Sequence, residues 1–247
     1  MIEKELGGFK VLLFEKLRDE NVFCCLTTKV YRDKPVFDMR RENISKKTPL
    51  FRKFLEAAGA ERYFYMRQAH TSNINVFEAG SAVCAEGDAA ATSLKKSALL
   101  GFSADCSLSL FYDRRNRALA VCHAGWKGAL LNIYENLFRR MHLSFGTRKE
   151  DLFVGAGPCI SAENYPVKKD LADKFFCLYG KTAGRFFRRR GGECLFSLEA
   201  VLKYQLKNLG IKEYEFSNLC TYEERELLYS HRRGDEGRFA MCAMLNK

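Results

Sequence analysis

The amino-acid sequence predicts an α/β fold with a mixed β-sheet core flanked by helices, within one domain that spans residues 1–247. Short runs rich in β-branched and aromatic residues alternate with stretches whose apolar residues recur at helical spacing. The length suits one large domain or two small ones, and no internal repeat, low-complexity tract or long linker divides the chain. A strand hairpin is expected at the centre of this core.

The expected hairpin joins two apolar runs, residues 107–112 and 118–122, across a polar turn. Both runs are short and rich in bulky apolar residues, as buried strands are. In an antiparallel pair, the start of the first strand lies beside the end of the second. Asp105 and Cys106 enter the first strand and His123 leaves the second. We therefore expect a carboxylate, a thiol and an imidazole to meet at this end of the hairpin.

The other elements are expected on either side of the hairpin. Before it, strands are expected at residues 9–13, 22–28, 62–66 and 75–78, an amphipathic helix at 50–58, an irregular segment at 37–49 and a surface segment at 80–94. After it, one helix is expected to run from residues 124–128 through Ile133, Leu137 and Met141, followed by a strand at 152–156, helices at 168–178 and 197–209, and closing strands at 211–216 and 239–245.

The composition is ordinary for a globular protein, with 47% hydrophobic residues and four Pro. Charged residues interrupt positions 1–20, so this stretch is not expected to be a signal peptide. No apolar run approaches the roughly 20 residues that a membrane helix needs. The ten Cys show no CxxC pair and no disulfide-framework spacing, so we expect reduced, mostly buried thiols and a cytoplasmic location.

The formal net charge of +11 is compatible with nucleic acid or with a phosphate-bearing small molecule as ligand. The charge is spread along the chain, and its densest cluster, residues 185–190, is expected to be a solvated loop after a helix. No nucleic-acid-binding motif accompanies that cluster. We therefore expect no nucleic acid and no membrane as partners, and a small anionic substrate instead.

Four His residues are candidates for chemistry. His70 lies at a strand-to-loop junction, and His123 lies at a strand end before a glycine-rich turn. His142 is expected to be a partly exposed histidine near a helix end, and His231 to make a loop or substrate contact in an arginine-rich segment.

His70, Cys106 and His123 together form a plausible catalytic metal set. Zinc accepts imidazole and thiolate, and catalytic zinc sites use three protein ligands and leave one position for water. The alternative for Cys106 is a small hydrophobe of the core. The same residues also fit a nucleophilic site in which Cys106 attacks, His123 is its base, and Asp105 or His70 orients that base.

The glycine-rich turn after His123 is a candidate anion site. Gly125 and Gly128 flank Trp126 and Lys127 at a helix start, where backbone N–H groups can hold an anion and Lys127 adds a charge. The structural alternative is a tight strand-to-helix turn that needs Gly. Trp126, the only Trp, is expected to pack in the core rather than to stack on a ligand.

A series of motifs stands in order along nearly the whole chain: Arg67-Gln68-Ala69-His70, Asp88-Ala89-Ala90-Ala91-Thr92, Ser103-Ala104-Asp105-Cys106, His123-Ala124-Gly125-Trp126-Lys127-Gly128, Gly157-Pro158-Cys159-Ile160, Cys220-Thr221-Tyr222, Ser230-His231-Arg232-Arg233 and Gly237-Arg238. They resemble the motifs of the YfiH family, also called the laccase-domain or multi-copper polyphenol oxidoreductase family. The motifs at Cys106 and His123 are specific in combination.

The resemblance implies a mixed β core flanked by helices, like that of bacterial deamidase toxins. It implies that His70, Cys106 and His123 bind a metal, most often zinc, with copper as the other candidate. Asp105 is the candidate proton carrier. The residues expected to bind substrate or phosphate are Lys29, Arg52, Gln68, Lys127 and Arg232.

Family members similar to this chain are described as purine nucleoside phosphorylases that also deaminate adenosine. The resemblance therefore implies a metal-dependent enzyme that uses phosphate to release purines from adenosine, inosine, guanosine and methylthioadenosine. In the deaminase reaction, water attacks the purine carbon that bears the amine. The alternatives are a cysteine amidohydrolase that edits cell-wall peptide precursors, a copper-dependent polyphenol oxidase, for which four His are few, and a binding partner without enzymatic activity.

Five positions depart from the family pattern: Lys29 replaces Arg, Phe51 replaces Asn, Thr71 replaces Gly, Lys127 replaces Arg and His231 replaces Tyr. The glycine-rich segment that the family carries after the first of these positions is also missing. Lys127 keeps a positive charge but loses the bidentate phosphate recognition of an arginine. We therefore expect an intact metal set with an altered group of substrate-facing residues.

Overall fold

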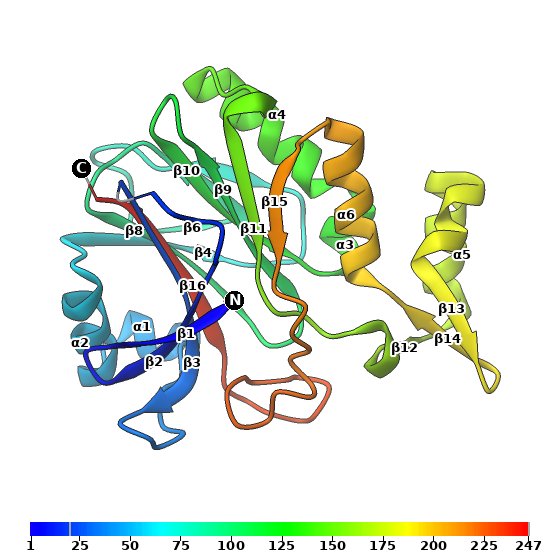
Figure 1. Cartoon of the computed structure of the whole chain (residues 1–247), viewed down its shortest axis with the longest axis horizontal. Helices are drawn as coiled ribbons and strands as arrows, with labels where there is room; N and C mark the ends of the chain where they lie inside the picture. The colour runs from blue at the N-terminus through cyan, green and yellow to red at the C-terminus, as the bar shows by residue number, and fades with distance from the viewer. Residues whose placement is uncertain (20, 247) are drawn as a thin grey trace.

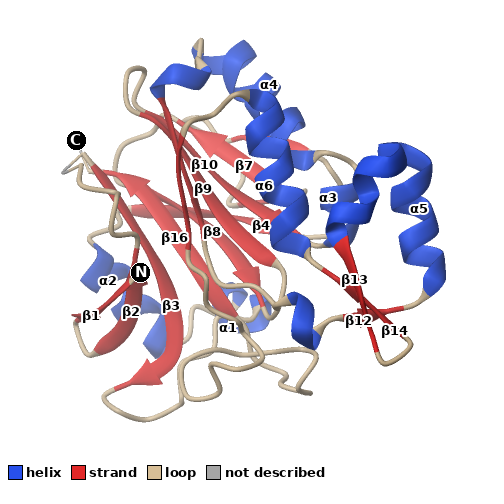
Figure 2. Cartoon of the chain, turned by 45° about the vertical axis from the view of Figure 1, so that its right-hand side comes forward, coloured by secondary structure: helices blue, strands red, loops and turns tan. Residues whose placement is uncertain are grey.

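The core of the protein is two β-sheets that pack face to face, each covered on its outer face by helices (Figures 1 and 2). The computed structural model describes residues 1–19 and 21–246. The mixed α/β class with sheets flanked by helices is the one predicted. The core contains two large sheets rather than one, and the predicted hairpin lies in the middle of the second.

The first sheet contains seven strands of the described chain, most of them antiparallel neighbours. In spatial order they are β1 (Ile2–Leu6), β2 (Phe9–Leu13), β3 (Val22–Tyr31), β16 (Phe239–Leu245), β8 (Ser97–Ser103), β4 (Arg62–Arg67) and β6 (Cys84–Glu86). The last three strands run parallel to one another, so β4 and β8 end at the same edge of the sheet.

The second sheet contains six strands of the described chain. In spatial order they are β15 (Glu213–Phe216), β11 (Leu152–Ala156), β9 (Ser107–Asp113), β10 (Ala118–Ala124), β7 (Ala89–Thr92) and β5 (Ile74–Val76). The predicted hairpin is the antiparallel pair of β9 and β10, in which Ser107 lies opposite Ala124 and Leu108 opposite His123. The starting end of β9 and the finishing end of β10 therefore lie side by side, as predicted.

Helices cover both outer faces of the two sheets. The α-helices are α1 (Arg41–Ser45), α2 (Pro49–Ala58), α3 (Trp126–Leu130), α4 (Ile133–Phe145), α5 (Lys169–Tyr179) and α6 (Leu198–Leu209), and short 3₁₀ helices occupy Lys149–Asp151, Ala162–Asn164 and Gly180–Phe186. A small third sheet of β12 (Pro166–Val167), β14 (Glu193–Phe196) and β13 (Phe187–Arg190) lies next to α5 (Figure 2).

The space between the two large sheets is filled by apolar side chains from both. Leu26 and Met241 of the first sheet share one buried cluster with Leu108 and Val121 of the second. Strands β8, β9, β10 and β16 are buried along their whole length, because one face meets the other sheet and the opposite face meets helices. Strands covered on both faces have continuous apolar runs, which is why strands were predicted at β9, β10 and β16. Strand β8 was not predicted from the sequence.

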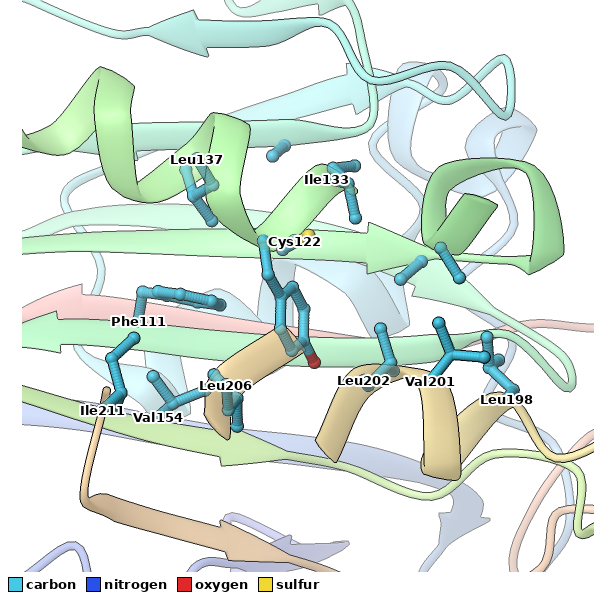
Figure 3. Close-up of a cluster of buried hydrophobic side chains, with 14 of the residues drawn as sticks. Phe111, Cys122, Ile133, Leu137, Val154, Leu198, Val201, Leu202, Leu206 and Ile211 are labelled. Carbon is cyan, nitrogen blue, oxygen red and sulfur yellow. The ribbon is translucent and has the colours of Figure 1, made fainter. Parts of the chain in front are cut away.

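A separate buried apolar cluster lies between the outer face of each large sheet and the helices that cover it. Phe51 and Phe54 of α2 pack on the first sheet. On the second sheet, Phe111 of β9 and Val154 of β11 face Leu206 of α6 (Figure 3). The helices present their apolar stripes to the sheets, so the sequence-based helix assignments at 50–58 and 197–209 agree with α2 and α6 within one residue.

The prediction of a surface segment at residues 80–94 was wrong, because this stretch contains β6 and the fully buried strand β7. In the sequence, the small alanines of this stretch stand among polar residues, a composition typical of surface segments. In the structure they let β7 fit between β10 and β5 beneath α4, where larger side chains would not pack. The expected strand at 75–78 is displaced to Ile74–Val76 by the same pairing.

Three other local predictions differ from the structure. The segment 37–49, expected to be irregular, contains α1. The single helix expected after the hairpin is two helices, since Asn132 adopts a left-handed conformation with φ 55° between α3 and α4. The basic cluster 185–190, expected to be a solvated loop, ends a 3₁₀ helix and forms β13, in which exposed Arg188 and Arg190 pair with Glu163.

None of the helices in the described residues is long and apolar enough to cross a membrane.

Candidate functional site

Three strand ends bring together the side chains that the sequence singled out. His70 follows the end of β4, Cys106 precedes the start of β9, and His123 is the next-to-last residue of β10. The side-chain amide of Gln68 fixes the first of these ends, because it donates to the carbonyl of Phe102 and accepts from the Phe102 N–H, both at 2.8 Å. That two-way bond ties the end of β4 to the end of β8.

His70, Cys106 and His123 form a cluster whose potential ligand atoms all lie within 4.8 Å of one another. The Sγ atom of Cys106 lies 3.9 Å from Nε2 of His70, and the two imidazole rings are 5.0 Å apart at 82°. His70 is exposed, Cys106 half-buried and His123 buried. This arrangement can hold a metal ion with a side open to solvent.

Asp88 fixes the geometry of this cluster, although no role was predicted for it from the sequence. The carboxylate is fully buried and accepts from Nδ1 of His123 at 2.9 Å. It also accepts from the N–H groups of His70 and Thr71, and from the Thr71 hydroxyl. One carboxylate therefore orients both imidazole-bearing segments and leaves Nε2 of His123 free, as the outer partners of metal-bound histidines do. Asp88 opens the Asp-Ala-Ala-Ala-Thr motif, which was the available signal.

Cys106, His123 and Asp88 shift one another's pKa values. Burial acts to raise the pKa of the Cys106 thiol, but the imidazoles of His123 and His70 lower it to about 6. Burial acts to lower the pKa of His123, but Cys106 and Asp88 raise it to about 9. For Asp88, burial is outweighed by hydrogen bonds from His123 and Thr71, which lower its pKa to about 2. The two imidazoles thus favour the thiolate of Cys106, which is the form that binds metals and attacks electrophiles.

Gly125 leaves the space that the cluster occupies. A Cβ at this position would lie 2.9 Å from Sγ of Cys106 and 3.1 Å from Cδ2 of His70. Its backbone, with φ −89°, suits any residue, so the glycine is needed for the close approach and not for its conformational freedom.

The cluster opens into a cavity of about 760 Å³. The aromatic residues that line it are Phe102, Trp126 and Tyr165. Trp126 also packs against the core under α4, so its ring serves both the packing role that was predicted and a cavity wall. The ammonium groups of Lys127 and Lys174 lie 5.7 and 5.3 Å from the centre of the Trp126 ring.

Asp105 and Arg232, both predicted site residues, line the same cavity. The Asp105 carboxylate accepts from the Thr221 hydroxyl at 2.6 Å and from the Arg232 N–H at 2.7 Å. These two groups hold Asp105, whereas Nδ1 of His123 donates to Asp88, so the carboxylate that orients His123 is Asp88 and not Asp105. The Arg232 guanidinium lies 5.3 Å from the centre of the Tyr165 ring. Gln68 and His231 also line the cavity.

Lys29, Arg52 and Lys127 are not among the residues that line this cavity. The Lys29 ammonium donates to the Arg225 carbonyl, and Arg52 is exposed on α2, where it donates to the Lys47 carbonyl. Lys127 is exposed on α3. Their roles in phosphate binding stay predictions from the family resemblance.

Four arginines in the cavity wall were not selected from the sequence. They are Arg40, Arg41, Arg67 and Arg238. Arg67 and Arg238 belonged to the quoted motifs without a role of their own, whereas Arg40 and Arg41 fell in the segment expected to be irregular. Sequence spacing held no signal for these two, because they reach the cavity only through the packing of residues 38–42 against 236–238.

A His–Cys–His cluster at the central strand ends of a four-layer fold, open to a cavity, is typical of an α/β protein with a metal or catalytic centre. The family model described as multi-copper polyphenol oxidoreductase laccase matches residues 37–246, and the chain belongs to that family.

Relatives of known sequence and structure agree with this membership. The chain is 30% identical over 158 residues to a Haemophilus influenzae protein named purine nucleoside phosphorylase, and the match spans 63% of each chain, just under two thirds of that relative's length. It is 24% identical over 184 residues to purine nucleoside phosphorylase YfiH of Escherichia coli, 74% of each chain. The crystal structure of the Bacillus licheniformis protein YfiH superposes with a TM-score of 0.77 at 25% identity over 96% of each chain.

Proposed function

We propose that this protein is a metal-dependent purine nucleoside phosphorylase, which transfers the ribosyl group of a purine nucleoside to phosphate and also deaminates adenosine in the same cavity. The observation that carries the proposal is the convergence of His70, Cys106 and His123 on the wall of one cavity. The printed names of the Haemophilus and Escherichia relatives support the reaction class.

The cavity has the size and chemistry for a nucleoside. Its volume of about 760 Å³ falls in the range of small-molecule sites. The rings of Trp126, Tyr165 and Phe102 in its wall offer apolar faces on which a purine can stack. Arginines in the same wall supply positive charge for phosphate.

The donor set fits zinc. Two imidazoles and a thiolate are ligands that catalytic zinc sites use, with a fourth position left open. His70, Cys106 and His123 would hold the ion, and Asp88 keeps Nδ1 of His123 engaged so that Nε2 is the free nitrogen. A zinc ion bound there supplies Lewis acidity toward an oxygen of the substrate or of water.

In phosphorolysis the main task of the protein is to position phosphate against the ribose of the nucleoside. A phosphate oxygen forms a bond to C1′ of the ribose while the bond from C1′ to the purine nitrogen breaks, and the purine leaves with a proton. Asp105 lines the cavity beside Cys106 and is the candidate to carry that proton, although both of its oxygens already accept hydrogen bonds. In deamination, water adds to the ring carbon that bears the amine, and ammonia leaves.

The proposal is tested by incubating purified, zinc-loaded protein with adenosine, inosine and methylthioadenosine, each with and without phosphate. We expect free base and ribose phosphate to appear only with phosphate, and ammonia to appear from adenosine in either condition. Cys106→Ala should abolish both reactions, because it removes one of the three ligands. Its circular dichroism and melting temperature should stay near those of the wild type. The proposal fails if zinc-loaded wild-type protein releases neither base nor ammonia.

A specific observation favours one other function, a cysteine amidohydrolase. Cys106, His123 and Asp88 are arranged as a nucleophile, a base and the group that orients the base. The imidazoles lower the pKa of Cys106 to about 6, as activated cysteines require. Such an enzyme would act on an amide, for example in a cell-wall peptide precursor, through a thioester formed at Sγ.

A chelator separates the two functions. The phosphorylase should lose activity after metal removal and regain it with zinc, whereas a cysteine amidohydrolase should keep its activity and lose it on alkylation of Cys106. Chelator-treated protein that cleaves a peptide amide and leaves nucleosides intact would establish the amidohydrolase.

A further inference from the structure

The cavity beside the His–Cys–His cluster carries more positive charge than its own carboxylates balance. Five arginines line it: Arg40, Arg41, Arg67, Arg232 and Arg238. Three carboxylates line it as well: Glu42, Asp105 and Glu236. The excess of guanidinium groups inside a concave, partly apolar wall creates a positive potential that attracts anions.

Most of these arginines are already engaged. Arg40 pairs with the Asp38 carboxylate, and its NH1 lies 3.7 Å from Glu236. Arg67 donates to Glu86 at 2.7 Å, and Arg238 donates to the carbonyls of its own loop. These groups shape the wall and are held in place by their partners.

Arg232 is engaged in a different way. Both of its terminal nitrogens donate weakly to the Pro166 carbonyl, at 3.3 and 3.4 Å, while its guanidinium lies over the Tyr165 ring. Its own N–H donates to Asp105. These contacts keep Arg232 at the end of the cavity near the cluster.

Arg41 differs from the other four arginines that line the cavity. Among the residues that the structure describes, its guanidinium has no hydrogen-bond or ion-pair partner, and its side chain is exposed where it lines the cavity. The carboxylate of its chain neighbour Glu42 helps to raise the pKa of Arg40. All donors of Arg41 are therefore available to a ligand.

We propose that Arg41 binds the phosphate group that this cavity takes. The inference rests on the proposed function for the identity of the anion, and it assigns the anion to a residue that the family resemblance did not indicate. Two oxygens of one phosphate match the fork of a guanidinium, and a charge-assisted pair of this kind is stronger in a concave wall than on an open surface. The group is either free phosphate or the 5′-phosphate of a purine nucleotide.

The placement of the other cations supports this choice. Of the cations predicted to bind substrate or phosphate, Lys29, Arg52 and Lys127 lie outside the cavity lining. Arg232 lines the cavity but is engaged with the Pro166 carbonyl and the Tyr165 ring. Lys127 has also lost the fork that an arginine would offer.

The test compares Arg41→Met with Arg41→Lys and with Arg140→Met, in the full-length, zinc-loaded protein. Arg140 is an exposed arginine on α4 outside the cavity, so its variant has the same change in net charge. Calorimetric titrations use inorganic phosphate, AMP and adenosine. Initial rates of inosine phosphorolysis are measured against phosphate concentration.

We expect Arg41→Met to raise the Kd for a phosphate-bearing ligand at least about tenfold, the loss that follows from removing a charged hydrogen-bond partner. Arg41→Lys should lie between Arg41→Met and the wild type, and Arg140→Met should match the wild type. Adenosine binding should change less than twofold in all three. A loss with inorganic phosphate identifies the free anion as the ligand, and a loss with AMP alone identifies the 5′-phosphate.

The inference is overturned if Arg41→Met binds both phosphate and AMP as the wild type does, or if the wild type binds neither. These results are separate from the fate of the proposed function. A wild type that binds phosphate through Arg41 but makes no ribose phosphate would reject the phosphorylase and keep the site. A wild type that is a phosphorylase, with both the KM for phosphate and the Kd for AMP unchanged in Arg41→Met, would reject the site alone.

Discussion

At the scale of single residues, Asp88 organises the site more than any ligand candidate does. It is fully buried, it accepts from Nδ1 of His123, and it accepts from the backbone of the His70 loop. His70 itself has a left-handed backbone with φ 56°, which a non-glycine residue adopts at a cost that surrounding bonds must offset. The hydrogen bonds to Asp88 are the bonds that hold this loop.

Asp88→Asn should weaken zinc binding by roughly 10- to 100-fold, the range seen when the partner of a metal-bound histidine is removed. The neutral amide no longer stabilises the imidazole by charge. Competition with a fluorescent chelator measures the affinity. Asp113→Asn is the matched control, because Asp113 is equally buried and accepts three hydrogen bonds at the far end of the same hairpin. It should cost stability without changing zinc affinity, and equal affinities for both variants would contradict the role of Asp88.

Gly125→Ala should also lower zinc affinity, since the new Cβ would lie 2.9 Å from Sγ of Cys106. The thiolate must move away from the two imidazoles to relieve that contact. Gly128→Ala in the next helical turn is the control, because the nearest atom to its new Cβ is 3.5 Å away. Zinc titration followed by the thiolate absorbance of a cobalt-substituted protein gives the comparison. The interpretation fails if Gly128→Ala loses as much affinity as Gly125→Ala.

At the scale of secondary-structure elements, the two large sheets set the position of the strand ends. Gly101 in β8 is a point of close approach, because a Cβ there would lie 2.8 Å from Cγ1 of Val121 in β10. Strand β10, which carries His123, therefore sits at a fixed distance from β8, and Gln68 ties the end of β8 to the end of β4 beside His70. Close packing between the two large sheets therefore fixes the positions of the strand ends that carry the site.

Gly101→Ala should lower the free energy of unfolding by about 1–3 kcal/mol, the usual cost of an added methyl group in a well-packed core. Urea denaturation at neutral pH measures the change. In a Val121→Ala background the obstructing methyl group is gone, so the same substitution should cost clearly less. A double-mutant cycle with no coupling between the two positions would show that the sheets do not meet there.

At the scale of the whole molecule, the segment 217–238 closes the cavity from the C-terminal side. Its contacts reach back to the centre of the chain, through Thr221 and Arg232 to Asp105. Arg233 holds the segment itself together by donating to three of its carbonyls and to Asp235. The cavity wall thus depends on residues more than a hundred positions apart.

Asp235 should make stability depend on pH at the acid end. Burial acts to raise its pKa, but hydrogen bonds from Arg233 and the Ser230 N–H lower it below the ordinary value in the folded state. A lowered folded-state pKa gives stability that is present above the pKa of the unfolded chain and is lost as pH falls through the folded-state pKa. Asp235→Asn should therefore be less stable than the wild type at pH 7 by up to about 1 kcal/mol, and this difference should shrink at pH 3.

Urea denaturation at both pH values measures this difference. Arg233→Met is the paired variant, because it removes the partner that lowers the pKa. Adding Asp235→Asn to Arg233→Met should produce little further pH dependence. A stability difference between the wild type and Asp235→Asn that is as large at pH 3 as at pH 7 would exclude the role of this ion pair.

The sequence by itself determined the elements whose local pattern is strong. The buried runs of β9, β10 and β16 and the amphipathic stripes of α2 and α6 follow from apolar spacing, which acts within a few residues. The hairpin placed Cys106 beside His123 for the same local reason. His70 came from the family motif and its strand-end position, and the structure brings it to the same cluster.

Only the tertiary structure decided which groups surround that cluster. Asp88 reaches His123 because β7 pairs with β10, and the alanines of β7 gave no strand pattern that would have predicted the pairing. Arg41 reaches the cavity because residues near 38 bond to residues near 238, a contact that no local periodicity encodes. Lys127 is next to Trp126 in sequence but projects outside the cavity, because α3 turns its side chain to solvent. Contacts between side chains that are far apart in the sequence depend on how the sheets and helices pack. The spacing of apolar residues indicates only the structure within one helix or strand.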